Sequence, residues 1–152
     1  MAAVDDLYRD ILLDHHKNPR RYGRIEHPDV TVEGANPLCG DEMVLTMNVS
    51  NGRIRELRLE SHGCSISRAS GSMMAEAIEG RTLAQAKELV SAFKGMMMGK
   101  ASAEDLPPEL EDLEALEGVR SFPVRVKCAL LAWNTLLEGL DAAEGAGRDG
   151  HH

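Results

Sequence analysis

Residues 43–61 read MVLTMNVSNGRIRELRLES. Apolar side chains occupy every second position over residues 43–49, and the alternation resumes over residues 57–61, which is typical of strands with one buried face. Between these runs, Asn51-Gly52 favours a tight hairpin turn. Ile54 is out of phase with the second run, so we expect a bulge or irregular pairing near the turn. This stretch therefore predicts an antiparallel β-hairpin.

Helical patterns flank the hairpin on both sides. Upstream, apolar residues recur at helical spacing over residues 4–12, and Pro19 and Gly23 follow as breakers. A short strand over residues 31–33 is expected between that helix and the hairpin. Downstream, an apolar stripe over residues 66–78 predicts a second helix. The chain therefore changes from helix to strands and back to helix.

The second half of the chain reads as helices. Thr82 and Gln85 have the spacing of a capping box, and Gly95 is expected to end the helix that they begin. A loop is expected at 96–99 and a short acidic helix over 102–118, and the longest apolar face follows at 126–140. We expect one α+β domain at residues 1–140, with three strands packed by helices, and a flexible tail at 141–152.

Composition narrows the class of protein. The chain has 152 residues and a formal net charge of −8, which argues against nucleic-acid binding. A local basic cluster at 17–24 reads as a solvated loop, or as a docking patch for an acidic partner. No apolar run is long enough for a membrane span, and the first residues lack signal-peptide features. We therefore expect a cytoplasmic protein with no membrane partner.

Three cysteines carry the candidate chemistry. An odd number in a reducing compartment favours metal ligands, reactive thiols or core residues over a disulfide framework. Cys39 lies in NPLCGD, Cys64 in SHGCSIS and Cys128 in the last helix, with Asp41 two residues after the first. Cys64 begins a helix, where the dipole and free amides favour a thiolate. Three thiolates and a carboxylate suit zinc or the iron of a cluster. Spacing alone leaves a metal site and buried structural thiols both open.

Arg125 and the histidines are secondary candidates. Arg125 precedes Cys128 by three residues, so it shares a helical face with it. Its guanidinium is expected either to hold a thiolate charge in place or to pair with a carboxylate at the surface. His62 reads as a hydrogen-bonded residue at the end of a strand, with a ligand or proton donor as the alternative. The histidines at 15 and 16 suit a helix C-terminus, and we assign them no role in a site.

Four segments together resemble one family. LYRDILLDHHKNPRRYG, GANPLCGDEM, SHGCSISRASGSMM and FPVRVKCALLAWNTL, in this order, are similar to the IscU/SufU family of iron–sulfur cluster assembly proteins, which includes NifU N-terminal-like domains. The likeness covers residues 7–137. It implies a three-stranded antiparallel sheet packed by helices, with the cysteines meeting at one edge. It also implies that Cys39, Asp41, Cys64 and Cys128 are the ligands of a metal or cluster.

Two details favour the SufU type within that family. IscU-type proteins carry a chaperone-binding motif before a His-Cys pair, whereas here Lys127 stands before Cys128 and the motif is degraded. The segment at 96–118 is an addition that resembles SufU-type proteins. The resemblance therefore implies a zinc-dependent sulfurtransferase whose partner is a SufS- or IscS-type cysteine desulfurase. Downstream partners would be other cluster-assembly or apo iron–sulfur proteins.

The implied mechanism gives each residue a role. Zinc keeps the thiols as thiolates, and one cysteine leaves the metal to attack a persulfide. We favour Cys39 as the acceptor because it lies on a glycine-flanked loop, with Cys128 as second choice. Asp41 would be a replaceable ligand and Arg125 would steady the freed thiolate.

Three rival functions remain. The first is a scaffold for a transient [2Fe–2S] cluster held by the same residues. The second is a zinc-stabilised interaction protein without chemistry. The third, a cysteine hydrolase, is disfavoured because no His and acid pair is recognisable beside a cysteine.

Overall fold

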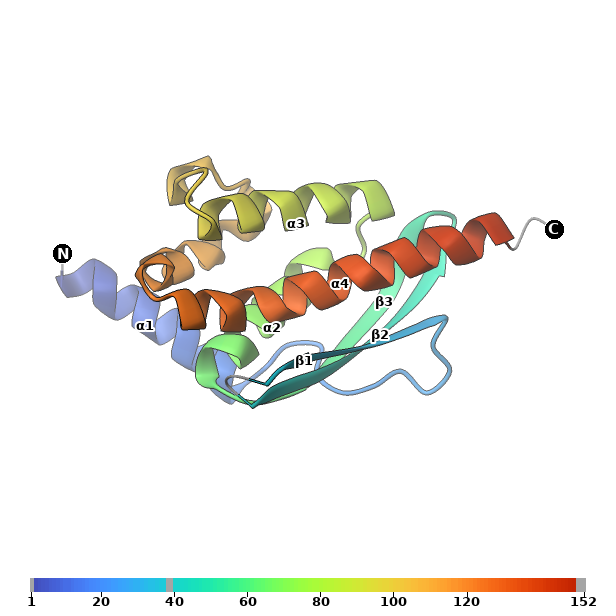
Figure 1. The fold of residues 1–152 in the computed structure, drawn as a ribbon, viewed down its shortest axis with the longest axis horizontal. Coiled ribbons are helices and arrows are strands. Elements are labelled where there is room, and N and C mark those ends of the chain that lie inside the picture. The colour runs from blue at the N-terminus through green and yellow to red at the C-terminus, as the bar shows by residue number, and fades with distance from the viewer. Residues whose placement is uncertain (1, 38–39, 150–152) are drawn as a thin grey trace.

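The computed structural model describes residues 2–37 and 40–149 (Figure 1). It combines one antiparallel sheet with α-helices and two 3₁₀ segments, which confirms the predicted α+β class. The elements in chain order are α1 (Ala2–Lys17), β1 (Val30–Asn36), β2 (Asp41–Ser50), β3 (Arg53–His62), α2 (Ser65–Ile78), α3 (Leu83–Met97), η1 (Ala103–Asp105), η2 (Pro108–Ser121) and α4 (Pro123–Asp149).

The sheet has the strand order β1-β2-β3, with both pairings antiparallel. Asn36 pairs with Asp41 at one end of β1 and β2, and Glu42 pairs with His62 at the same end of β2 and β3. The register shifts between Asn48 and Val49, which confirms the irregularity predicted near the hairpin turn. β1 is longer than the predicted strand at 31–33.

Helices cover one face of the sheet. α2 packs on β3, and α4 packs on β1 and β2, while α3 lies along the other side of α4 (Figure 1). Alternate residues of the hairpin, such as Leu45 and Leu57, are fully buried in this core. Between α3 and α4, the rings of Phe93 and Trp133 stack with centroids 4.7 Å apart. The alternation in the sequence therefore marked the buried face of the sheet correctly.

The ends of α3 confirm one prediction and correct another. Thr82 and Gln85 form the predicted capping box, with each side chain bonded to the other residue's backbone N–H. The prediction that Gly95 ends the helix was wrong, because α3 continues to Met97. Met96 and Met97 are buried in the core. Their burial outweighs the roughly 1 kcal/mol that glycine costs in a helix relative to alanine.

The expected acidic helix at 102–118 is instead two 3₁₀ segments, η1 and η2. Leu110, Leu113 and Leu116 are all buried. Their spacing of three matches the period of a 3₁₀ helix, in which residues i and i+3 lie on one face. The apolar spacing is visible in the sequence, but a spacing of three also fits one face of an α-helix, which is the structure that we expected.

α4 continues past residue 140, where we placed the end of the domain. No proline follows, and Lys87 of α3 forms ion pairs with Asp141 and Glu144 of this extension. The Glu144 carboxylate, as the largest contributor, raises the pKa of Lys87. The division at residue 140 stays a prediction, and His151 and His152 lie outside the described residues. Within the described chain, no helix is both long and apolar enough to cross a membrane.

Candidate metal centre

Cys64 is the N-cap of α2. Its backbone is extended, and its sulfur accepts a hydrogen bond from the backbone N–H of Ser67 at 3.4 Å. The sulfur therefore lies at the positive end of the helix dipole, where negative charge is stabilised. The prediction that Cys64 begins a helix is confirmed. The side chain is partly exposed, so a partner or solvent can reach it.

Asp41 faces Cys64 from the first position of β2. Its Oδ1 accepts the backbone N–H of Cys64 at 2.8 Å, and its Oδ2 lies 3.8 Å from the Cys64 sulfur. The Asp41 side chain is almost wholly buried, with the residue 1% exposed. Gly63 permits this approach, because a Cβ there would collide with the Asp41 carboxylate and stand 2.9 Å from its Cα. Backbone geometry thus holds a buried carboxylate against a thiol.

Cys128 reaches the same place from α4. It is 3% exposed, and the side-chain amide of Asn36 donates to its sulfur at 3.8 Å. Asn36 ends β1 and pairs with Asp41 in the sheet, so the start of β2 and the second turn of α4 meet at this edge. An amide donor stabilises negative charge on the sulfur.

These three side chains form a cluster that suits a metal ion. One ligand atom each from Asp41, Cys64 and Cys128 lies within 4.8 Å of the others. Two sulfurs and a carboxylate oxygen, supported by the Asn36 amide and the Ser67 backbone, are a donor set that fits zinc. Cys39, the fourth predicted ligand, lies outside the described residues, in the four-residue connection between Asn36 and Asp41. The structure therefore brings together the three predicted ligands that it describes.

The described contacts of the secondary candidates, Arg125 and His62, are with their own neighbours in the chain. Arg125 is exposed, and its guanidinium stacks over the Phe122 ring, 5.3 Å from the centroid. His62 is exposed at the end of β3, with Nε2 3.5 Å from a carboxylate oxygen of Glu60. The prediction that His62 lies at the end of a strand is therefore confirmed. The role of Arg125 stays a prediction.

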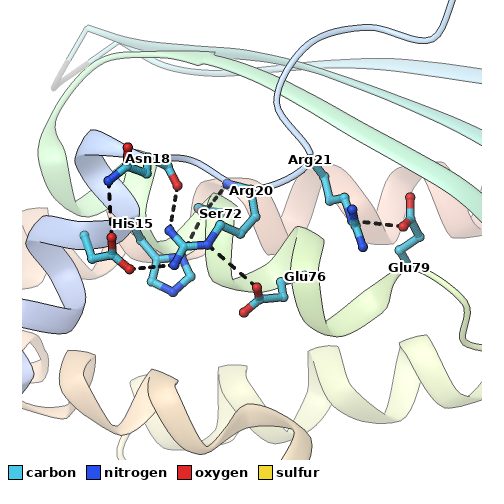
Figure 2. A network of polar contacts seen from close by, with 8 residues as sticks. His15, Asn18, Arg20, Arg21, Ser72, Glu76 and Glu79 are labelled. Carbon is cyan, nitrogen blue, oxygen red and sulfur yellow. Dashed lines mark hydrogen bonds and ion pairs between the residues drawn. The ribbon is translucent and has the colours of Figure 1, made fainter.

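The basic cluster at 17–24 is largely paired with carboxylates. Arg20 pairs with Asp14 and approaches Glu76, Arg21 pairs with Glu79, and Figure 2 shows these contacts between α1, the following loop and α2. Arg24 likewise pairs with Glu60 of β3. These pairs hold the loop on the fold. The interpretation as a docking patch for an acidic partner therefore has no support in the described contacts.

Asn36 and Gly63 are the site residues that the sequence analysis missed. Asn36 stands in the predicted motif GANPLCGD, and Gly63 stands directly before Cys64. Glycine before a helix-capping cysteine is a signal for a close backbone approach, and Gly63 has φ +149°. Asparagine at a strand end carries no comparable signal, because its partner is 92 residues away.

Comparisons with known proteins agree with this fold and site. The sequence model of the family described as NifU-like N terminal domain matches residues 7–129. The chain is 42% identical over 144 residues to the zinc-dependent sulfurtransferase SufU of Bacillus subtilis, covering 95% of this chain and 96% of that protein. It is 34% identical to the iron–sulfur cluster assembly scaffold protein IscU of Streptococcus pyogenes, covering 96% and 90%.

Solved structures give the same result. The crystal structure of an iron–sulfur cluster assembly scaffold protein for the SUF system from Fervidobacterium islandicum AW-1 superposes with a TM-score of 0.77 at 36% identity, covering 86% of this chain and 94% of that one. The N-terminal part of a NifU-like protein from Brucella abortus shares the fold, with a TM-score of 0.83 at 23% identity, covering 93% and 97%. The chain belongs to the NifU-like N-terminal domain family.

Proposed function

We propose that this chain is an iron–sulfur cluster assembly protein that works as a zinc-dependent sulfurtransferase, accepting persulfide sulfur from a cysteine desulfurase. The observation that carries the proposal is the cluster of Asp41, Cys64 and Cys128, whose ligand atoms lie within 4.8 Å. The likeness to the sulfurtransferase SufU over 95% of the chain supports the same activity. The expected setting is the reducing cytosol, where free thiols persist.

The chain's own groups prepare the site for sulfur chemistry. Cys39, Asp41, Cys64 and Cys128 would hold zinc, which when bound keeps cysteine sulfurs deprotonated at neutral pH. The Asn36 amide supports the Cys128 sulfur, and the Ser67 N–H supports the Cys64 sulfur. Buried Asp41 is fixed by the Cys64 backbone, so its carboxylate is positioned before any ion binds.

Cys39 is proposed as the sulfur acceptor. Cys128 is buried within α4, and Cys64 caps α2, so a large displacement of either would disturb a helix packed in the core. In the transfer, the Cys39 thiolate forms a bond to the outer sulfur of the desulfurase persulfide. The S–S bond of the desulfurase breaks at the same time, and its cysteine leaves as a thiolate. The exchange needs no external electron or proton.

Arg125 is proposed to steady thiolate charge at this edge. It lies one helical turn before Cys128 on α4, and its guanidinium is exposed on the Phe122 ring. An exposed guanidinium on an aromatic ring is pre-oriented at little further entropic cost. Lys127 is also exposed on this turn, so it offers a matched cation without that stacking contact in the described residues.

A scaffold for a transient [2Fe–2S] cluster is the second candidate. The relative from Streptococcus pyogenes and the Fervidobacterium islandicum structure are both described as scaffolds, and the same four residues would hold the cluster. In that case intact clusters, rather than sulfur, would pass to apo iron–sulfur proteins. If the chain shows neither activity, the remaining interpretation is a zinc-stabilised interaction protein without chemistry.

The experiment measures alanine production by a SufS-type cysteine desulfurase with and without the zinc-loaded chain. We expect stimulation by the wild-type chain, loss of stimulation with Cys39→Ser, and a weaker response with Arg125→Gln than with the control Lys127→Gln. No stimulation by the zinc-loaded wild type would remove the sulfurtransferase proposal. A cluster that reconstitutes on the chain and transfers intact to an apo-ferredoxin would establish the scaffold instead.

A further inference from the structure

A second group of potential metal ligands lies away from the cysteines. His15 of α1, Glu76 of α2 and Asp112 of η2 each offer a ligand atom, and these atoms lie within 4.8 Å of one another. The three residues come from segments far apart in sequence. Figure 2 shows His15 between α1 and α2, with Ser72 and Glu76 on the neighbouring helix. The fold, rather than local sequence, therefore assembles this group.

His15 is held in the orientation of a metal ligand. The residue is 3% exposed, and its Nδ1 lies 2.7 Å from the hydroxyl oxygen of Ser72. Ser72 is itself fixed, because its hydroxyl accepts the backbone N–H of Arg20 at 2.8 Å. Nδ1 is thereby occupied, and in the described part of the chain Nε2 makes no hydrogen bond. A ligating histidine is commonly fixed in this way through its other ring nitrogen.

The imidazole is also favoured in the neutral form that binds metals. Burial is the main cause that lowers the pKa of His15 below its usual range, and the charge of Arg20 acts in the same direction. The carboxylates of Glu76 and Asp112 oppose this shift without reversing it. The direction of this shift favours the uncharged ring, in which one nitrogen keeps a lone pair.

The two carboxylates are free to turn toward an ion. Both side chains are exposed. Arg20 reaches Glu76 only at 3.7 Å, while its shorter contacts are to Asp14 and to the backbone oxygen of Asn18. Within the described ranges, Asp112 makes no ion pair, and none joins His15 to either carboxylate. A salt bridge among the described residues therefore does not explain why His15, Glu76 and Asp112 lie close together.

A cleft of about 270 Å³ opens beside this group. Glu76 and Asp112 line it together with Glu109 and Glu111, while Arg81 is its one cation among the described residues. Four carboxylates against one guanidinium raise the local concentration of cations in this cleft. Through Glu76 and Asp112, the cleft borders the ligand group that includes the buried imidazole.

We propose that His15, Glu76 and Asp112 bind a divalent transition-metal ion at a site separate from the cysteine cluster. One imidazole and two carboxylates suit zinc and similar first-row ions, with water filling the remaining positions. Ligand atoms around a tetrahedral zinc lie roughly 3.4 Å apart, so small side-chain rotations of Glu76 and Asp112 close the site. The bound ion ties α1, α2 and η2 together.

The test uses the chain after its cysteine site has been filled with zinc and excess metal removed. Isothermal titration with Zn²⁺ alone is expected to show one further equivalent per chain. Asp112→Asn and Glu76→Gln should each weaken this second equivalent at least about tenfold, and Ser72→Ala should weaken it by about tenfold. Glu111→Gln, an exposed neighbour in the same cleft, is the matched control and should leave it unchanged. These positions other than Ser72 are exposed, so their variants should fold.

A spectroscopic readout ties the ion to His15. Zn²⁺ should shift the Nε2 resonance of His15 in long-range ¹H–¹⁵N spectra of the wild type, but not of Asp112→Asn. The absence of a second equivalent would overturn the proposal. A second equivalent that survives both Asp112→Asn and Glu76→Gln would overturn it as well, because zinc would then be held elsewhere, for example by His151 and His152.

Discussion

The substitution Gly63→Ala tests how backbone geometry holds the metal centre. The new Cβ would collide with the Asp41 carboxylate and stand 2.9 Å from its Cα. The second contact is to backbone, so a side-chain rotation cannot relieve it. We therefore expect Asp41 to move and to lose its 2.8 Å hydrogen bond from the Cys64 N–H.

The magnitude follows from two separate effects. A non-glycine residue at φ +149° carries a strain of about 1–3 kcal/mol, which lowers the stability of the metal-free protein. Loss of the carboxylate hydrogen bond is worth about 1.5–3 kcal/mol. If the whole of that loss falls on metal binding, the Kd for zinc rises roughly ten- to 150-fold.

Gly23→Ala separates these effects. Gly23 also has a positive φ, +119°, but a Cβ there meets nothing within 4 Å. Both variants should lose stability in thermal unfolding of the metal-free protein, and Gly63→Ala should lose more because its Cβ also collides with Asp41. Only Gly63→Ala should weaken zinc binding in a competition titration with a chromophoric chelator. Equal zinc affinities of the two variants would refute the argument that Gly63 positions Asp41.

Three further substitutions test the packing and the support of the site. Ser70→Ala leaves the buried indole N–H of Trp133 without the hydroxyl that accepts it at 3.0 Å, so urea unfolding should show a loss of about 1–3 kcal/mol; an unchanged midpoint would contradict this. Thr82→Ala removes half of the α3 capping box and should cost about 0.5–2 kcal/mol in the same assay, whereas a neutral result would mean that the cap is dispensable. Asn36→Ala removes the amide from the Cys128 sulfur and should weaken zinc about tenfold or more, which the chelator titration measures; unchanged affinity would show that this amide does not support the site.

The hairpin and the main helices were predictable because their signals are local. Alternation over 43–49, the Asn51-Gly52 turn and the capping box at Thr82 each involve neighbours in the chain, and all three are confirmed. The continuation of α3 past Gly95 was not predictable, because the burial of Met96 and Met97 depends on tertiary packing. The 3₁₀ geometry of η2 was missed because a spacing of three is shared with one face of an α-helix.

The ligand residues of the site were predictable from the sequence, but the residues that hold those ligands in place were not. Family motifs marked Asp41, Cys64 and Cys128, which the structure brings together. The contact from Asn36 to Cys128 joins residues far apart in sequence, and nothing local indicates it. His15 was assigned no role because a histidine at a helix end has a sufficient local explanation in the dipole. Its proximity to Glu76 and Asp112 exists only once α1, α2 and η2 have packed.

The most direct test of the proposed function is to find which cysteine carries sulfur after reaction with a desulfurase persulfide. The zinc-loaded chain is incubated with a SufS-type desulfurase and cysteine, trapped with an alkylating reagent and mapped by peptide mass spectrometry. The account predicts persulfide on Cys39, with zinc retained, and none in Cys39→Ser, which should still fold. Persulfide found chiefly on Cys128 or Cys64, or on no cysteine while the desulfurase is active, would contradict it.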